Sequence, residues 1–153
     1  MTTLTSEQLL PISINDAWNF FSNPANLNEI TPGNMSFRIL VDLPGHIFEG
    51  QIIKYKVAPL AGIPLNWVTK IINVNAPFSF TDEQISGPYK VWIHQHHFRE
   101  ADGGTLMRDI VQYDIGKGIA GKIAGRLFVH NRIKNIFTFR TKKLEELFGK
   151  SIK

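Results

Sequence analysis

The chain has 153 residues, of which 43% are hydrophobic and 20% are charged, as is ordinary for a soluble globular protein. This length predicts a single domain over residues 1–153 with a buried core. The absence of cysteine excludes disulfide bonds, thiolate metal sites and cysteine nucleophiles. The first residues lack the basic and apolar segments of a signal peptide, and no run approaches the roughly 20 apolar residues of a membrane span. We therefore expect a cytoplasmic protein without membrane insertion.

The net charge of +4 is unevenly distributed along the chain. Residues 1–116 contain 7 Lys and Arg against 11 Asp and Glu, whereas residues 117–153 contain 10 against 2. A basic C-terminal segment is typical of the solvated face of a helix, or of a surface that meets an anionic partner. In the second case the chain would be an interaction module acting through Lys122, Arg126, Arg132 and Lys134. We expect no binding to nucleic acid.

The first third of the chain predicts one strand and two short helices. Residues 4–12 read as a strand. A short helix over 16–22 follows, with Asn15 as its N-cap, and Asn23 caps a second helix that has Pro24 at its first position and runs to residue 30. The segment Thr31-Pro32-Gly33 then stops it.

The middle of the chain predicts six further strands. Alternating or β-branched runs cover residues 35–41, 51–57, 65–74 and 78–86, separated by Pro- and Gly-containing breaks. Residues 89–113 form a hairpin around Asp102-Gly103, a strong signal for a two-residue type I′ turn.

After Gly116 the apolar period changes from 2 to about 3.6 residues, which predicts one long amphipathic helix. Its expected apolar stripe comprises Ile119, Ile123, Leu127, Ile133, Ile136, Phe137, Leu144, Leu147 and Phe148. One helix cannot cover both faces of a seven-stranded antiparallel sheet, so the sheet must curl around it, and a sheet curled around one helix tends to leave a cavity between them. The predicted fold class is α+β: a curved seven-stranded antiparallel sheet around a long C-terminal helix, with two short helices between the first two strands.

The hairpin carries an unusual polar cluster on its apolar face. If Asp102 and Gly103 form the loop, His96 faces Asp109. The same count pairs Phe98 with Met107, His94 with Val111, and Trp92 with Tyr113. If residues 87–89 form a three-residue turn, Asp82 faces His94, and Gln84 shares the face of Asp82. Tyr55 and Trp67 also fall on the inward face of their strands.

Four interpretations of this cluster remain open. His–Asp pairs can satisfy each other's buried polar groups and fix the strand register. They can instead orient the polar end of a ligand in an apolar cavity. His96, or its neighbour His94, could act in general acid–base catalysis, with Asp109 fixing the imidazole tautomer. Finally, His94-x-His96 with one Asp could bind a metal ion, although we assign neither a metal nor another cofactor.

Several short motifs resemble those of the SRPBCC superfamily, which includes START lipid-transfer domains, birch-pollen-type allergens and polyketide cyclases, and in particular its bacterial ligand-binding subgroup. The motifs are Asn26-Leu27 with Ile30-Thr31-Pro32, residues 63–67 (IPLNW), residues 80–84 (FTDEQ) with Gly87-Pro88-Tyr89, Trp92-x-His94-x-His96-x-Phe98, residues 104–109 (GTLMRD) with Val111 and Tyr113, and Ile136-Phe137 with Arg140. The resemblance covers nearly the whole chain. It implies a START-like helix-grip fold with a hydrophobic ligand-binding cavity, and it implies no particular reaction.

We therefore predict a carrier or sensor that binds a small hydrophobic or amphipathic molecule between the sheet and the C-terminal helix. An enzyme of the cyclase, dehydratase or lyase type that uses the His/Asp cluster is the alternative. Neither the ligand nor the oligomeric state can be inferred from the sequence. The expected ligand-binding residues are Tyr55, Trp67, Asp82, Gln84, Trp92, His94, His96, Phe98, Met107, Asp109 and Tyr113.

Overall fold

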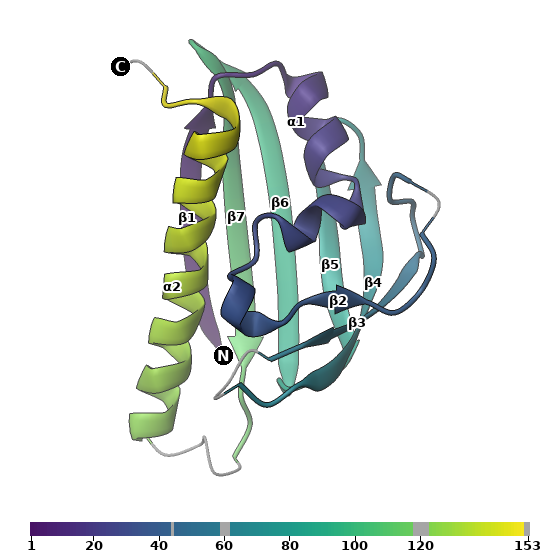
Figure 1. The fold of residues 1–153 in the computed structure, drawn as a ribbon, viewed down its shortest axis with the longest axis vertical. Helices are drawn as coiled ribbons and strands as arrows, with labels where there is room; N and C mark the ends of the chain where they lie inside the picture. Colours follow the sequence, from purple (N-terminus) through teal and green to yellow (C-terminus); the bar gives the residue numbers. More distant parts are fainter. Residues whose placement is uncertain (44, 59–61, 118–122, 152–153) are drawn as a thin grey trace.

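The computed structural model describes residues 1–43, 45–58, 62–117 and 123–151 (Figure 1). The elements in chain order are β1 (Thr2–Leu10), α1 (Ile14–Phe21), the 3-10 helices η1 (Pro24–Asn28) and η2 (Gly33–Met35), β2 (Arg38–Ile39), β3 (Ile52–Val57), β4 (Leu65–Asn75), β5 (Ser79–Ser86), β6 (Val91–Ala101), β7 (Gly104–Asp114) and α2 (Ile123–Phe148).

The described strands form one antiparallel sheet in the order β1-β7-β6-β5-β4-β3-β2. The two terminal segments are neighbours in space, because β1 pairs with β7 at one edge and α2 runs alongside them (Figure 1). The sheet curves, and α1 and η1 cross its central strands on the side where α2 lies (Figure 1). This is the helix-grip α+β fold that the sequence predicts, including its two short helices between the first two strands.

The short N-terminal elements differ from the prediction at their ends. Ser13, rather than Asn15, caps α1, because its hydroxyl accepts a hydrogen bond from the backbone N–H of Asp16 at 3.1 Å. The second helix begins as predicted, but it is a 3-10 helix that ends at Asn28. The expected strand over 35–41 shrinks to β2, because η2 occupies residues 33–35 and Ser36 adopts a left-handed φ of 48°.

The register of the central hairpin is the predicted one. His96 faces Asp109 across β6 and β7, and Asp82 faces His94 across β5 and β6. The predicted turn type is wrong: a type I′ turn needs positive φ at both central residues, and only Gly103 of the pair has it. Gly104 follows with a φ of 144°, and a side chain at this position would collide with the backbone of Leu10.

Helix α2 packs on the sheet through one face. Val129, Ile133, Phe137 and Leu144 are buried along this face. Leu127 belongs to the predicted stripe but is exposed, because it lies about 120° around the helix from Ile133. Leu147, near the end of the helix, is also exposed. The predicted residues Ile119 and Lys122 lie outside the described ranges, as does the side chain of Ile123.

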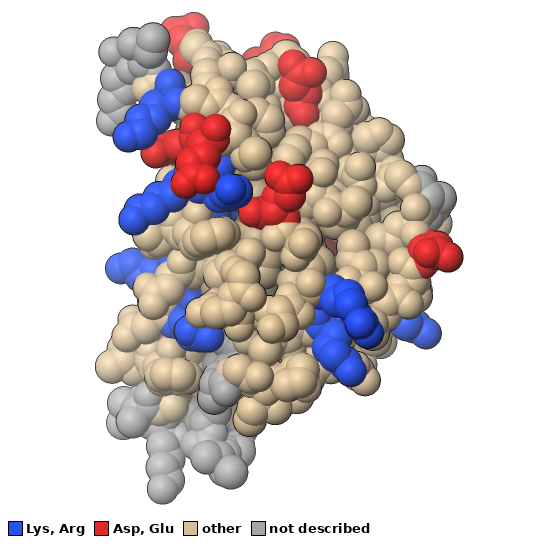
Figure 2. Space-filling view, viewed as in Figure 1, with Lys and Arg blue, Asp and Glu red and all other residues tan. Residues whose placement is uncertain are grey.

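Lys and Arg side chains gather on the α2 side of the molecule, in agreement with the basic C-terminal sequence (Figure 2). Arg140 departs from this pattern, because it is 8% exposed on the packed face of α2. None of the described helices has a segment both long and apolar enough to cross a bilayer.

Candidate ligand-binding site

A cavity of about 150 Å³ lies inside the curved sheet, between its concave face and α2. Its wall is mostly apolar and includes aromatic side chains from the four neighbouring strands β3 to β6. The non-aromatic and polar parts of the wall come from the N-terminal helices, the strands and α2. The lining residues are Phe20, Phe21, Asn23, Pro24, Asn26, Leu27, Ile30, Thr31, Met35, Phe37, Ile39, Ile47, Ile53, Tyr55, Val57, Trp67, Thr69, Ile71, Phe80, Asp82, Tyr89, Trp92, His94, His96, Ile133, Ile136, Phe137 and Arg140.

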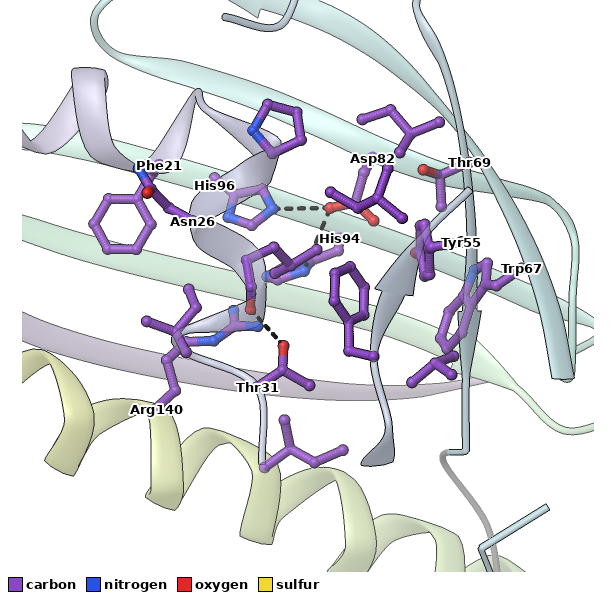
Figure 3. Close-up of a pocket in the computed structure, with 18 of the residues that line it drawn as sticks. Phe21, Asn26, Thr31, Tyr55, Trp67, Thr69, Asp82, His94, His96 and Arg140 are labelled. Carbon is purple, nitrogen blue, oxygen red and sulfur yellow. Dashed lines mark hydrogen bonds and ion pairs between the residues drawn. The ribbon is translucent and has the colours of Figure 1, made fainter. Parts of the chain in front are cut away.

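Two histidines and two aspartates form a polar cluster at one part of this wall. Nε2 of His94 lies 2.8 Å from Oδ1 of Asp109, and Nε2 of His96 lies 2.9 Å from Oδ2 of Asp82. Both hydrogen bonds run diagonally between strands, rather than between directly facing residues. Nδ1 of His96 also lies 3.0 Å from Oδ1 of Asp109, but outside hydrogen-bond geometry. The cluster is therefore one connected unit, of which Figure 3 shows the three wall residues Asp82, His94 and His96.

Both carboxyl groups of the cluster favour the ionised form. Burial opposes ionisation of Asp109, but the hydrogen bond from His94 and the close contacts and charges of both histidines outweigh it and hold the pKa of Asp109 far below its usual range. The same histidines outweigh burial at Asp82 and lower its pKa. Since ionised carboxylates only accept hydrogen bonds, the Nε2 atoms of both histidines donate.

The two imidazoles respond to the cluster in opposite directions. Burial disfavours the charged form of His96, but its contacts with Asp109 and Asp82 outweigh burial and raise its pKa. At His94, burial and the neighbouring charge of His96 together lower the pKa. The two histidines therefore carry one positive charge more readily than two, and that charge lies on His96.

Aromatic rings fix the orientation of both imidazoles. The ring of His96 stacks on Phe80, with centroids 4.2 Å apart and planes 16° apart, and on its other side lies His94 at 3.8 Å. The edge of His94 meets Phe137 of α2, with centroids 5.6 Å apart. Packing on both sides leaves the imidazoles little freedom to rotate, so the cluster presents a preorganised polar surface to the cavity.

Arg140 lies on the opposite wall from the strands. Its guanidinium extends from α2 toward the side of the cavity where His94 and Thr31 lie (Figure 3). The guanidinium carbon lies 5.0 Å from the ring centroid of Phe137. Its Nε finds no hydrogen-bond acceptor in the described part of the chain. The sequence analysis did not single out this residue as a site residue, although it lies close to the middle of the apolar stripe, seven residues after Ile133 and four before Leu144.

Six of the residues expected at the site line the cavity. They are Tyr55, Trp67, Asp82, Trp92, His94 and His96. The indole Nε1 of Trp67 is buried and has no acceptor among the described residues, so it can donate a hydrogen bond to an enclosed polar atom.

The other five expected residues are not part of the cavity wall. Asp109 is 1% exposed and lies behind the histidines. Phe98 packs against Phe21 of the wall, and Met107, its partner across the hairpin, is equally buried. The hydroxyl group of Tyr113 bonds with Nδ1 of His130 at 2.8 Å.

The fifth residue, Gln84, fixes a turn instead of lining the cavity. Its side-chain amide donates a hydrogen bond to the backbone oxygen of Tyr89 at 2.7 Å. Alternation along a strand finds the concave face, but it cannot tell the core beneath the cavity from the cavity wall. Alternation also gives no information on the part of the wall that comes from η1, η2 and the chain after them, because these segments are not strands.

Three side chains of the polar cluster have the ligand atoms of a metal site. Single ligand atoms of Asp82, His94 and His96 lie within 4.8 Å of one another. Asp109 would support such a site from behind, since it holds the opposite nitrogen of His94. Metal binding would require the hydrogen bond between His96 and Asp82 to break.

No protein-family model and no curated protein sequence matches the chain. Solved structures do match it over nearly its whole length. Protein CV1439 from Chromobacterium violaceum aligns with a TM-score of 0.73 at 11% identity, covering 96% of both chains. Ara h 8.0201 aligns with a TM-score of 0.65 at 15% identity, covering 96% of this chain and 97% of its own. Ginseng major latex-like protein 151 from Panax ginseng aligns with a TM-score of 0.66 at 12% identity, with the same coverage. At these identities the likeness shows the fold alone, which is the helix-grip fold described above.

Proposed function

We propose that the protein binds a small hydrophobic or amphipathic molecule in the interior cavity and acts as a carrier or sensor of that molecule. The observation that carries this proposal is the cavity itself, because its wall is predominantly apolar and its polar groups gather at a few positions. Sites for small organic ligands combine these two features. The unsatisfied indole N–H of Trp67 adds a donor that a ligand oxygen can use.

The likeness to helix-grip structures supports the proposal at the level of the fold. A curved sheet closed by one long helix leaves interior space that side chains need not fill. The cavity would hold roughly ten water molecules, counting about 15 Å³ for each. An interior of this size and polarity favours a compact organic ligand.

The contacts of His96 favour ligand binding over general base catalysis. A general base needs a free nitrogen within reach of the substrate proton. Nε2 of His96 is held by Asp82 and its Nδ1 lies beside Asp109. Both nitrogens are thus engaged by carboxylates, and the raised pKa of the ring favours the imidazolium, which has no lone pair to accept a proton.

The proposal is tested by filling the cavity from within. Ile136 lines the cavity and is half-buried on α2, so Ile136→Trp adds volume toward the ligand space. Phe139 of the same helix is 36% exposed and lies outside the wall, so Phe139→Trp is the matched control. Calorimetric titration with decanol, a neutral amphipathic probe, should show binding to the wild type and to the control. Binding to Ile136→Trp should weaken about tenfold or more, equivalent to about 1.4 kcal/mol.

Failure of decanol and of related alcohols of different chain length to bind the wild type would contradict the proposal. Equal affinity in both Trp variants would place the binding elsewhere. Denaturing mass spectrometry of small molecules that remain bound to protein purified from its own host would then identify the natural ligand.

A further inference from the structure

The polar donors of the cavity wall are not equally satisfied. The amide of Asn26 donates to the backbone oxygen of Phe20 at 3.0 Å, and the hydroxyl group of Thr31 donates to the backbone oxygen of Leu27 at 2.6 Å. Arg140 differs from both. Its Nε has no acceptor in the described ranges, and among these residues it forms no ion pair with a carboxylate.

An arginine in this position needs an anionic partner. The guanidinium is always charged and offers five N–H donors. Removing a charged group from water costs several kcal/mol unless an opposite charge and hydrogen bonds compensate for it. The face of Phe137 contributes a cation–π contact, whose contribution of about 0.5–2 kcal/mol is smaller than that cost.

The carboxylates of the site fill this need only in part: Asp82 and Arg140 attract each other through their charges, but among the described residues no carboxylate oxygen lies within ion-pair distance of the guanidinium. Asp82 accepts a hydrogen bond from His96, and Asp109 accepts one from His94. Asp109 also lies behind both imidazoles rather than in the cavity wall. A molecule inside the cavity can therefore supply the acceptor that the described residues do not offer to Nε of Arg140.

We propose that the ligand is an amphipathic monocarboxylate whose head group pairs with the guanidinium of Arg140. Its apolar part then lies among the aromatic side chains of the cavity wall, such as Trp67 and Trp92. This assignment rests on the proposed ligand-binding function and specifies the class of the ligand. A carboxylate matches the planar guanidinium with two parallel hydrogen bonds. One negative charge also suits this wall better than a phosphate dianion, since the described lining residues include one arginine, Arg140, and no lysine.

His94 lies beside the proposed position of the head group. Its Nδ1 lies 3.5 Å from Oδ2 of Asp82, beyond the usual length of a strong hydrogen bond. Its ring contacts Phe137, the same ring that the guanidinium of Arg140 contacts. Arg140 and His94 therefore flank one aromatic ring, and both present nitrogen atoms toward the same part of the cavity (Figure 3).

Three probes of equal chain length test the head group: decanoate, decanol and decylammonium. Calorimetric titration of the wild type at neutral pH should show decanoate binding at least about tenfold more tightly than decanol, since charge-assisted hydrogen bonds are about twice as strong as neutral ones. Decylammonium should bind most weakly. Equal affinities for decanoate and decanol, or a preference for decylammonium, would overturn the inference. Binding of decanol without a preference for decanoate would leave the proposed function intact, whereas binding of none of the three probes would contradict the proposed function as well.

Variants of Arg140 locate the preference. Arg140→Met keeps an unbranched apolar side chain, and it should remove most of the preference for decanoate while changing the affinity for decanol less than about threefold. Arg140→Lys keeps the charge but loses the planar fork, so it should retain part of the preference. Lys142→Gln, which removes one exposed charge from the same helix, is the control and should behave as the wild type does.

Two results would overturn the assignment even if decanoate binds well. One is an undiminished preference for decanoate in Arg140→Met. The other is a preference that disappears when the wild type is treated with EDTA, because the carboxylate would then bind through a metal ion held by Asp82, His94 and His96. If Arg140→Met does not fold, the comparison of the three probes in the wild type and in Arg140→Lys still decides the question.

Discussion

Asp109 and His94 are bound to each other across a diagonal of the sheet, with Oδ1 and Nε2 2.8 Å apart, although Asp109 directly faces His96. The same carboxylate oxygen lies 3.0 Å from His96. One buried oxygen therefore bonds to His94 and lies against His96 from behind, while Asp82 contacts both imidazoles from the cavity side. This arrangement lets a buried residue outside the wall determine how the wall presents its nitrogens.

Asp109→Asn should destabilise the fold for two reasons. The amide carries no charge to balance that of His96, and it replaces one of the two acceptor oxygens with an NH2 donor. Loss of one member of a buried charged network typically costs about 3–5 kcal/mol. Urea denaturation should show this loss as a lower midpoint. His97→Gln is the control, since His97 is exposed on the opposite face of β6, and it should change the free energy of unfolding by less than about 0.5 kcal/mol. A midpoint as high in Asp109→Asn as in His97→Gln would show that the carboxylate is not needed for stability.

The contribution of Asp109 to stability should depend on pH in a defined direction. Its pKa is lowered in the folded state, so below the ordinary Asp range, near about pH 4, the unfolded chain binds more protons than the folded chain. The stabilisation is complete above that range and is lost as the pH falls toward the folded pKa. The difference in free energy of unfolding between the wild type and Asp109→Asn should therefore narrow as the pH decreases below about 4. Denaturation at a series of pH values measures this difference, and a constant or widening gap would contradict the argument.

The sequence was sufficient for the sheet because strand alternation and turn signals are local. The count across Asp102-Gly103 gives the right register even though the turn type is wrong, since register depends on the number of loop residues and not on their φ angles. The short β2 strand could not be predicted in the same way. Its loss depends on the left-handed backbone of Ser36, which the alternating sequence pattern does not reveal.

The candidate site was predictable only where it lies on strands. Asp82, His94 and His96 were found because alternation places them on the concave face. Asn26 lies on η1 and Thr31 in the bend after it, and the position of both on the sheet depends on tertiary packing. Arg140 did leave a signal, a lone charge near the middle of an apolar helical stripe. The predicted stripe includes Leu127, which is exposed. The buried face is therefore narrower than predicted, and Arg140 lies on it between the buried residues Phe137 and Leu144.

Phe98 and Phe80 should separate the packed core from the cavity wall. Both are buried, but only Phe80 lines the cavity. Replacing either with Ala should cost about 3–5 kcal/mol of stability. Phe98→Ala should leave the affinity for decanol within about threefold of the wild type, whereas Phe80→Ala should change it further, because it removes the ring that stacks on His96. Calorimetric titration with decanol, at a temperature below the thermal unfolding midpoint of both variants, makes the comparison. Equal changes in affinity would show that the two positions are not functionally distinct.

Binding of a carboxylate should be accompanied by proton uptake at His94. This imidazole is faced by Asp82 from β5, His96 from β6, Asp109 from β7, and Arg140 with Phe137 from α2. With His94 neutral and His96 charged, the two carboxylates are balanced by His96 and Arg140. An additional carboxylate leaves one unbalanced negative charge beside His94, and a nearby opposite charge raises the pKa of an imidazole.

The sign of the linkage follows from the free protein. Its lowered pKa keeps His94 neutral, so a ligand that raises this pKa takes up a proton, and decanoate should bind more tightly as the pH falls from about 8 to about 6. Calorimetric titration in two buffers with different ionisation enthalpies should show uptake of up to one proton for decanoate and none for decanol. His94→Gln should abolish the uptake and retain binding. Equal proton uptake with decanol would show that closure of the cavity, rather than the negative charge of the ligand, shifts the equilibrium of His94.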